Sequence, residues 1–148
     1  MFAPKNILVP TDFSEHADKA LKEAVAIAEQ YKSKIFLLHV YDEGLQQCAV
    51  DYCLPFEQVA SLENAAIKTS KERLDEEVKA IASGGKVQIA YDIQKGLPVE
   101  TILQEQKDLG IDLIVMGSHG RTGLLKSLIG SVAERVVRNA GCEVLVVR

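Results

Sequence analysis

Small and polar residues gather in one segment of the chain, residues 116–131, between an apolar run and an amphipathic one. The segment contains Gly117, Gly120 and Gly130, and Ser131 follows the last of these glycines. Glycine lets backbone N–H groups approach an anion closely, and the first turn of a helix adds unpaired donors and a partial positive charge. These residue types therefore predict a phosphate-binding loop that leads into a helix.

Two familiar nucleotide-binding patterns are absent from the sequence. There is no G-x-x-x-x-G-K-[ST], and Gly117, Gly120 and Gly123 do not fit G-x-G-x-x-G. The pattern therefore disfavours an ordinary P-loop NTPase and a dinucleotide-binding dehydrogenase. A loop whose glycines serve only tight turns stays open as the alternative.

The elements that must position this loop follow from the spacing of apolar residues. Apolar runs predict five strands, at residues 6–9, 34–40, 87–93, 112–116 and 144–147. Amphipathic spacing predicts four helices, at about residues 15–31, 56–82, 98–109 and 131–140. Strands joined by helices run parallel with right-handed crossovers, and nearly continuous apolar strands are typical of a sheet covered on both faces. The sequence thus predicts a single α/β domain with an open, doubly wound, five-stranded parallel sheet of Rossmann-like form.

Ligands of such sheets bind at the carboxyl ends of the strands, at the switch point. Pro10-Thr11-Asp12, His39-Val40 and Met116-Gly117 all follow or end predicted strands. A carboxylate such as Asp12 at a strand end must be exposed or partnered. The alternative for Asp12 is a capping role beside Ser14, the predicted N-cap of the first helix.

Composition indicates which classes of binding partner are expected. The chain has 148 residues, 47% hydrophobic and 26% charged, with a net charge of −4. Without a basic stripe or run, a nucleic-acid partner held through its phosphates is not expected. No apolar run approaches the length of a membrane span, so no membrane partner is expected either.

Cysteine usage predicts a compartment. An odd count of three cysteines without a recognisable secretion signal predicts reduced thiols and a cytoplasmic location. Cys48 and Cys53 could form a redox pair or bind a metal with His39, but the absence of a second such pair favours ordinary thiols in a variable loop.

Three motifs make the chain resemble the universal stress protein family along nearly its whole length. Residues 7–14, Ile-Leu-Val-Pro-Thr-Asp-Phe-Ser, resemble the family's opening strand and loop. Gly117, two residues, Gly120, nine residues and then Gly130-Ser131 match its nucleotide signature. Gly96-Leu97-Pro98 resembles its turn into the third helix. The resemblance implies one family domain over residues 1–148, with a fold like that of the adenine nucleotide alpha hydrolases.

The glycine signature marks the members of the family that bind ATP, so the resemblance implies an ATP site (or an ADP or AMP site), with Mg²⁺ or Mn²⁺ accompanying the phosphates. The residues expected at this site are Pro10, Thr11, Asp12, Val40, Met116, Gly117, Ser118, His119, Gly120, Arg121, Gly130, Ser131 and Val132. By resemblance, Asp12 and the backbone of Val40 contact the adenine.

The other roles are expected from residue type. The three glycines would wrap the phosphates, and the N–H groups of Ser131 and Val132, with the Ser131 hydroxyl, would cap them. Pro10 and Thr11 would form the floor of the expected nucleotide site. The remaining members keep two interpretations. Ser118 and His119 would face ribose or phosphate, although His119 could be an exposed loop residue. Arg121 and Lys126 would either reach the outer phosphates or be solvated charges. Met116 would either pack near the sugar or base or belong to the core.

The last strand carries a further expectation. The resemblance implies a homodimer in which residues 144–147 pair across a two-fold axis, and a short, apolar, terminal edge strand fits this because an unpaired edge invites association. An edge covered by a loop of the same chain is the alternative. The chain has Gly141-Cys142-Glu143 where members often carry proline before this strand.

The site has donors but no convincing general base, and phosphoryl transfer needs a positioned water or base. Ser118 and His119 are sequence neighbours and cannot be assumed to form a nucleophile–base pair. The sequence therefore favours an ATP-binding switch or sensor of the stress response, read by an unknown partner protein, over an enzyme. A nucleotide-independent dimeric interaction module and a slow ATPase or self-phosphorylating protein stay open.

Overall fold

The computed structural model describes residues 1–42, 51–121 and 128–148. One sheet of five parallel strands has the order β3-β2-β1-β4-β5. Its strands are β1 (Asn6–Pro10), β2 (Lys34–Tyr41), β3 (Gln88–Lys95), β4 (Leu113–Gly117) and β5 (Glu143–Val147). The predicted fold is confirmed, and strand ends differ from the expected ones by at most two residues. Pro10 closes β1 opposite Leu38, as proline can at a strand terminus.

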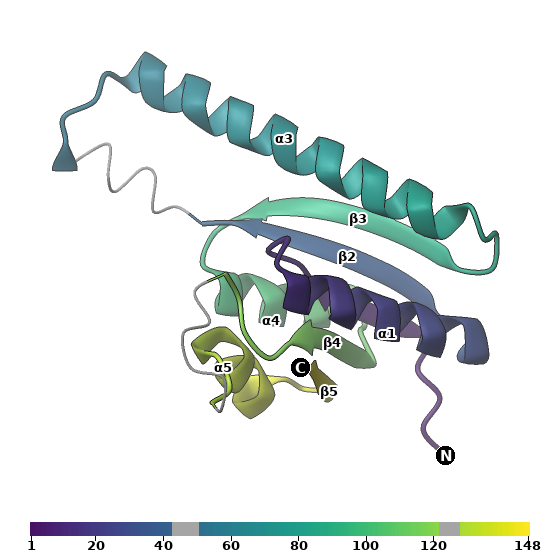
Figure 1. Cartoon of the computed structure of the whole chain (residues 1–148). Coiled ribbons are helices and arrows are strands. Elements are labelled where there is room, and N and C mark those ends of the chain that lie inside the picture. Colours follow the sequence, from purple (N-terminus) through teal and green to yellow (C-terminus); the bar gives the residue numbers. More distant parts are fainter. Residues whose placement is uncertain (43–50, 122–127) are drawn as a thin grey trace.

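Two helices cover each face of the sheet. Helices α1 (Glu15–Tyr31) and α3 (Phe56–Ala82) lie on one face, and α4 (Pro98–Asp108) and α5 (Ser131–Asn139) lie on the other (Figure 1). The predicted N-cap is confirmed, because the hydroxyl of Ser14 accepts the N–H of Ala17 at 3.2 Å. Each helix buries its apolar stripe against the strands, as a doubly wound fold requires.

The core is split into two clusters by the sheet. The cluster under α1 and α3 includes Ile7, Val9, Ala24, Ile35, Leu37, Leu74 and Val115. The cluster under α4 and α5 includes Leu8, Leu38, Ile102, Ile114, Met116, Ala133 and Val136. Strands β1 and β4 are buried along most of their length, whereas the edge strands β3 and β5 have no fully buried residue. Both faces are therefore fully covered at the centre of the sheet, whereas the residues of the edge strands β3 and β5 are at most partly buried.

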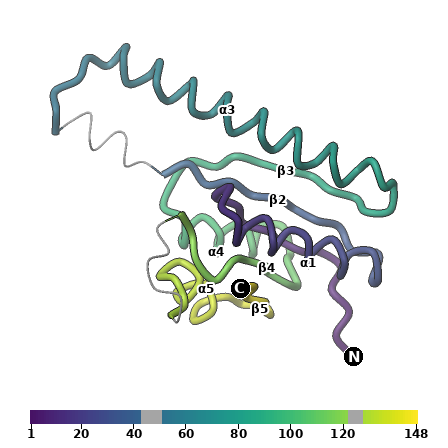
Figure 2. Tube along the Cα trace, viewed as in Figure 1, coloured from purple at the N-terminus to yellow at the C-terminus, as the bar shows by residue number. Residues whose placement is uncertain are grey.

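Helix α3 is longer than the sheet beneath it. Its 27 residues extend about 40 Å, whereas an eight-residue strand such as β3 extends about 26 Å. The C-terminal half packs through Leu74, Val78 and Ile81, and the N-terminal half runs past the ends of β2 and β3 (Figure 2). Phe56 there is 85% exposed and Leu62 is 52% exposed. The predicted apolar face of residues 56–82 is thus buried only in part.

No helix in the described ranges is long and apolar enough to cross a membrane.

Candidate functional site

The reversal of strand order lies between β1 and β4, which are neighbours in the sheet but follow each other in the chain only after two further strands. From β1 the chain turns into α1 on one face, and from β4 it leads to α5 on the other. The carboxyl ends of these two strands are the switch point, where doubly wound sheets bind their ligands. Residues 10–14 and 117–121 therefore come together there.

The turn after β1 is held by its own side chains. The N–H of Thr11 donates to the carbonyl oxygen of Leu38 at 2.8 Å, and the N–H of Phe13 donates to Thr11 Oγ1 at 3.1 Å. The N–H of Ser14 donates to Asp12 Oδ1 at 3.0 Å. Phe13 has a φ of 62°, which side-chain-bearing residues rarely adopt. The turn is thus a fixed platform that presents the second oxygen of Asp12.

That second oxygen meets the loop after β4. Asp12 Oδ2 accepts the N–H of Arg121 at 3.1 Å, and Arg121 Nε donates to the carbonyl oxygen of Asp12 at 2.7 Å. The loop comes so close that a Cβ at Gly120 would lie 2.7 Å from Asp12 Oδ2. Asp12 therefore bridges two segments far apart in the sequence, beyond the capping role considered for it, and Arg121 is bonded rather than freely solvated.

The other two glycines of the signature also lie against protein atoms. A Cβ at Gly117 would lie 2.8 Å from the Cβ of His16 and 2.9 Å from its carbonyl carbon. A Cβ at Gly130 would lie 3.0 Å from the carbonyl oxygen of Ser118, which accepts the N–H of Gly130 at 2.7 Å. Packing of the loop on itself and on α1 thus requires glycine at these positions, whatever the loop binds. Gly123 and Lys126 lie outside the described residues.

The start of α5 offers donors to an anion. Gly130 is its N-cap residue, and within the ranges the structure describes no side chain caps this helix. The N–H groups of Ser131 and Val132 belong to the first turn, where backbone donors have no partner inside the helix. Together with the helix dipole they form a positive end at the carboxyl edge of the sheet, which fits a phosphate group.

Three expected residues take part in the packing beneath this edge. Met116 is buried in the cluster under α4 and α5, and Val40 and Val132 pack against the same cluster. Met116 is thus a core residue, as its alternative interpretation had it. Pro10 is half-buried at the end of β1.

Two histidines meet beside the loop. Ser118 Oγ lies 3.0 Å from His119 Nδ1, and the rings of His119 and His16 are 5.5 Å apart. His119 Nε2 and His16 Nδ1 are buried without a hydrogen-bond partner among the described residues. Ser118 and His119 are thus hydrogen-bonded despite being neighbours in sequence, but Ser118 is only 2% exposed, which hinders a nucleophilic role. His119 is half-buried rather than an exposed loop residue.

A second aromatic group lies at the end of β2. His39 Nδ1 lies 2.9 Å from the carbonyl oxygen of Thr11, so this nitrogen carries the hydrogen. The His39 ring is 4.6 Å from that of Phe13, and the Arg73 guanidinium of α3 lies 4.3 Å from the Phe13 ring centre. Burial lowers the pKa of His39; the bond to Thr11 opposes this, and the nearby charge of Arg121 lowers the pKa further.

The metal or redox alternative for His39, Cys48 and Cys53 is not tested, because Cys48 lies outside the described residues. Cys53 is exposed. Within the described ranges, no group of three or more histidine, cysteine, aspartate or glutamate residues is placed to hold a metal ion.

Three residues of this site carry no local signal of a binding role in the sequence. His16, Phe13 and Arg73 occupy positions typical of a helix surface or a loop, whereas His39 was placed at a strand end and was also weighed as a metal ligand. Their contacts arise when α1 and α3 pack beside the strand ends, so only the order of the elements could have revealed them.

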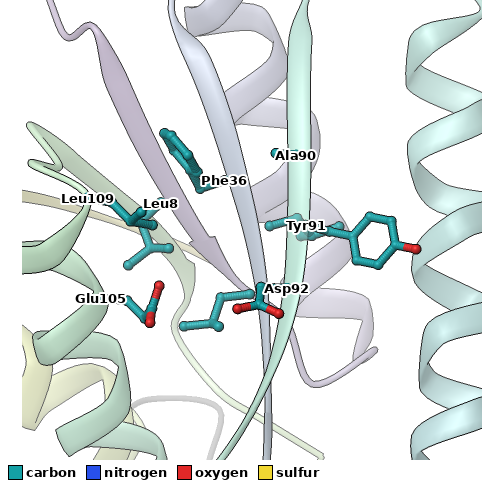
Figure 3. A pocket seen from close by; sticks show the side chains of 9 residues that line it. Leu8, Phe36, Ala90, Tyr91, Asp92, Glu105 and Leu109 are labelled. Atoms are coloured by element: carbon teal, nitrogen blue, oxygen red, sulfur yellow. The ribbon is translucent and has the colours of Figure 1, made fainter.

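Away from this edge, a hollow of about 110 Å³ lies on the α4 side of the sheet (Figure 3). Leu8, Phe36, Leu109, Asp92 and Glu105 are among the residues that line it. The Glu105 carboxylate of α4 and the Asp92 carboxylate of β3 both lie toward this hollow, whereas the Tyr91 ring lies toward α3 (Figure 3). Burial raises the pKa of Glu105, and the negative charges of Asp92 and Asp108 add to the rise. Asp92 and Glu105 thus line the same hollow, and the described structure has no hydrogen bond between their carboxylates.

Comparison with known proteins agrees with the motifs. The model of the universal stress protein family matches residues 4–148. The universal stress protein MJ0531 of Methanocaldococcus jannaschii is 35% identical over 97% of this chain and 82% of its own. The solved structure of protein MJ0577, also 35% identical, superposes with a TM-score of 0.84 over 99% of this chain and 96% of that one. UspA of Lactobacillus plantarum is 29% identical, with a TM-score of 0.83 over 97% of both chains.

More distant structures share the fold alone. A universal stress protein solved in complex with cAMP is 24% identical, with a TM-score of 0.69 over 99% of this chain and 98% of that one. Another, from Archaeoglobus fulgidus in complex with dAMP, is 20% identical, with a TM-score of 0.67 over 99% of this chain and all of that one. The fold, the motifs and the match over nearly the whole sequence lead to one conclusion: this chain belongs to the universal stress protein family.

Proposed function

We propose that this protein binds ATP, or another adenine nucleotide, at the carboxyl ends of β1, β2 and β4 and acts as a nucleotide-dependent switch or sensor. The observation that carries the proposal is the meeting of three segments at one edge of the sheet. Asp12 is bonded to Arg121, Ser118 is bonded to Gly130, and the start of α5, which no described side chain caps, follows directly. This arrangement supplies a carboxylate for a base or sugar and backbone donors for phosphates.

The roles of the parts follow from their chemistry. The N–H groups of Ser131 and Val132 would hold a phosphate, with the Ser131 hydroxyl as a further donor. Asp12 and the backbone at Val40 would contact the adenine. Mg²⁺ or Mn²⁺ would arrive with the phosphates and keep its waters, since nucleotide-bound magnesium uses few protein ligands. Two structures with this fold, solved with cAMP and dAMP, support an adenine nucleotide as the ligand class.

Calorimetry with ATP and Mg²⁺ tests the proposal. The wild type should bind one nucleotide per chain, and Gly130→Ala should weaken binding because its Cβ would press on the Ser118 carbonyl oxygen. Gly84→Ala is the matched control, since its nearest atom would lie at an ordinary 3.5 Å. At a hundred times its Kd the nucleotide should stabilise the fold by about 2.7 kcal/mol, which thermal melting checks independently. A wild type that binds no adenine nucleotide would reject the proposal.

One observation favours a second candidate, a dimeric interaction module that ignores nucleotide. Each signature glycine already lies against protein atoms, so the signature is explained without a ligand. The same calorimetry separates the two candidates, because the module predicts no heat of binding and no shift in melting temperature.

Slow hydrolysis or self-phosphorylation is a further alternative, favoured by the Ser118–His119 hydrogen bond. Phosphate release from ATP and mass change of the protein measure it directly. A switch without turnover should saturate with nucleotide and release no phosphate above the rate of an Asp12→Ala variant.

We also propose a homodimer through β5. Leu145 on this edge strand is 38% exposed, and the outer edge of β5 has no partner strand in the described residues. Leu145→Lys should convert the dimer into a monomer in sedimentation velocity, because a lysine on an edge opposes strand pairing. A variant that remains dimeric would place the interface elsewhere.

The partner that recognises the nucleotide-bound form would be a protein. The net charge of −4 opposes binding to nucleic acid, and the odd number of cysteines fits the cytoplasm as the compartment.

A further inference from the structure

Phe13 is a bulky residue held in a left-handed backbone conformation directly after Asp12. Its φ of 62° is unfavourable for any residue with a Cβ, and such strain persists only where the surroundings impose it. Strained residues of this kind gather at ligand sites, where they fix a neighbouring group. The question is what holds Phe13 in place.

Three contacts hold it, and each comes from a different element. Its N–H donates to Thr11 Oγ1 at 3.1 Å, within the turn after β1. Its ring lies 4.6 Å from the ring of His39 on β2, and the Arg73 guanidinium on α3 lies 4.3 Å from its centre. Both Thr11 and His39 are themselves bonded to each other, through the Thr11 carbonyl oxygen. Arg73 is therefore the contact that ties this platform to a separate helix.

Arg73 lies over the ring although an acidic residue is within reach on its own helix. Glu77 stands one turn further along α3, and its Oε2 is buried without a hydrogen-bond partner among the described residues. Burial raises the pKa of Glu77, the charge of Asp18 on α1 raises it further, and Arg73 lowers it. The guanidinium thus contacts the Phe13 ring while its charge also acts on the Glu77 carboxylate. Leu74, the next residue, is fully buried and anchors this part of α3 in the core.

We propose that Phe13 is a positioning residue for the nucleotide site, that Arg73 holds it in its strained conformation, and that nucleotide binding is thereby coupled to the order of α3 around Arg73. The inference rests on the proposed nucleotide site. Asp12 bonds to Ser14 and Arg121 only while the turn keeps its shape, and the shape includes the left-handed Phe13. Coupling is reciprocal, so a ligand that fixes the turn also orders the helix that contacts it.

Two variants of α3 test the coupling. Arg73→Ala should raise the Kd for ATP with Mg²⁺ about five-fold, because it removes a cation–π contact of ordinary strength. Lys71→Ala removes the same charge from the same helix without touching Phe13 and should leave the Kd unchanged. Arg73→Lys, which keeps a cation over the ring, should restore most of the affinity. At Phe13, tyrosine should retain binding and leucine should weaken it.

Hydrogen exchange provides a readout that needs no nucleotide. The amides of Ser14 and Arg121, which both donate to Asp12, should exchange faster in Arg73→Ala than in the wild type and unchanged in Lys71→Ala. With nucleotide, exchange near residue 73 should slow in the wild type and not in Phe13→Leu.

The outcomes are distinguishable. A wild type that binds no nucleotide overturns the proposed function, and the exchange of Ser14 and Arg121 then still decides whether Arg73 positions the turn. Equal weakening by Arg73→Ala and Lys71→Ala would reduce the effect to net charge and overturn the inference. Unchanged exchange of Ser14 and Arg121 in Arg73→Ala would overturn it as well.

Discussion

Two carboxylates of this protein lie in half-buried places and have opposite surroundings. Asp12, at the carboxyl end of β1, accepts the N–H groups of Ser14 and Arg121, one on each oxygen. Glu105, on α4, lies at a hollow beside Asp92 and Asp108, and its pKa is raised by burial and by these like charges. In the sequence, Asp12 follows a predicted strand, whereas Glu105 lies inside a predicted helix between Gln104 and Gln106.

The difference shows how position in the fold decides whether a carboxylate is oriented by hydrogen-bond donors or destabilised by like charges. A carboxylate that accepts two backbone N–H groups is held in one orientation, whereas burial among like charges raises the pKa of a carboxyl group. The candidate nucleotide site contains the first kind. The hollow on the α4 side contains the second kind, Glu105, whose charge at neutral pH lowers the stability of the fold.

The largest expected loss of stability follows from substitution of Asp12. Asp12→Ala leaves the part-buried N–H of Ser14 and the exposed N–H of Arg121 without their acceptor and should lower the free energy of unfolding by about 2 kcal/mol. Urea unfolding measures the loss, and Asp12→Asn, which keeps one acceptor oxygen, should lose less. If alanine costs less than about 0.5 kcal/mol, Asp12 does not join the turn to the loop.

A smaller loss is expected when the loop is pushed away while the carboxylate stays. Gly120→Ala brings a Cβ to 2.7 Å from Asp12 Oδ2, so the side chain must shift and the bond to Arg121 weakens. We expect a loss of about 1 kcal/mol in thermal or urea unfolding, near the worth of one hydrogen bond. Gly84→Ala, which meets no atom closer than 3.5 Å, is the control. Equal effects of the two substitutions would contradict close contact at Gly120.

Substitution of Glu105 should stabilise the fold rather than destabilise it. Glu105→Gln removes a charge held among like charges, so at pH 7 it should raise the free energy of unfolding by about 0.5 kcal/mol, typical of surface charges. Because the folded pKa of Glu105 is raised, its contribution to stability is present below the unfolded pKa and lost as pH rises through the folded pKa. The advantage of the variant should therefore shrink on acidification, in unfolding curves taken from pH 7 to pH 4. An advantage that persists at acid pH would argue against the like-charge explanation.

The smallest effect concerns His39, a base beside the same site. Its folded pKa is lowered, so the stability it contributes is present above its unfolded pKa of about 6.5 and lost as pH falls through the folded value. The wild type should lose a few tenths of a kcal/mol more than His39→Gln between about pH 7 and pH 5. The slopes of stability against pH are the measurement, since both proteins differ at every pH by the bond to Thr11. Parallel slopes would mean that His39 titrates as it does in the unfolded chain.

Much of the fold was predictable because its signals are local. The spacing of apolar residues predicted all five strands and the four helices now labelled α1, α3, α4 and α5 to within about two residues, and Ser14 was predicted as the start of α1. The exposed half of α3 was not predictable, because apolar residues such as Phe56 and Leu62 keep helical spacing whether or not a sheet lies beneath them.

The candidate site was predictable only in its parts. Glycine at 117, 120 and 130 was singled out from spacing, with phosphate contact as the reason. The structure adds a reason that no local pattern contains, the close approach of His16, Asp12 and Ser118 to these positions. Phe13 and Arg73 were missed because a strained φ and a contact between helix and loop leave no trace in residue type.

The sequence by itself therefore determined which segments are strands and helices, where the loops at the strand ends lie and which of them are rich in glycine. Each of these depends on the conformational preferences and burial of residues within a few positions of one another. Only the tertiary structure decided that β1 lies beside β4, and hence that Asp12 meets Arg121 across more than a hundred residues. The reason is physical: alternating strands and helices are compatible with several strand orders, and the packing of two complete cores selects among them.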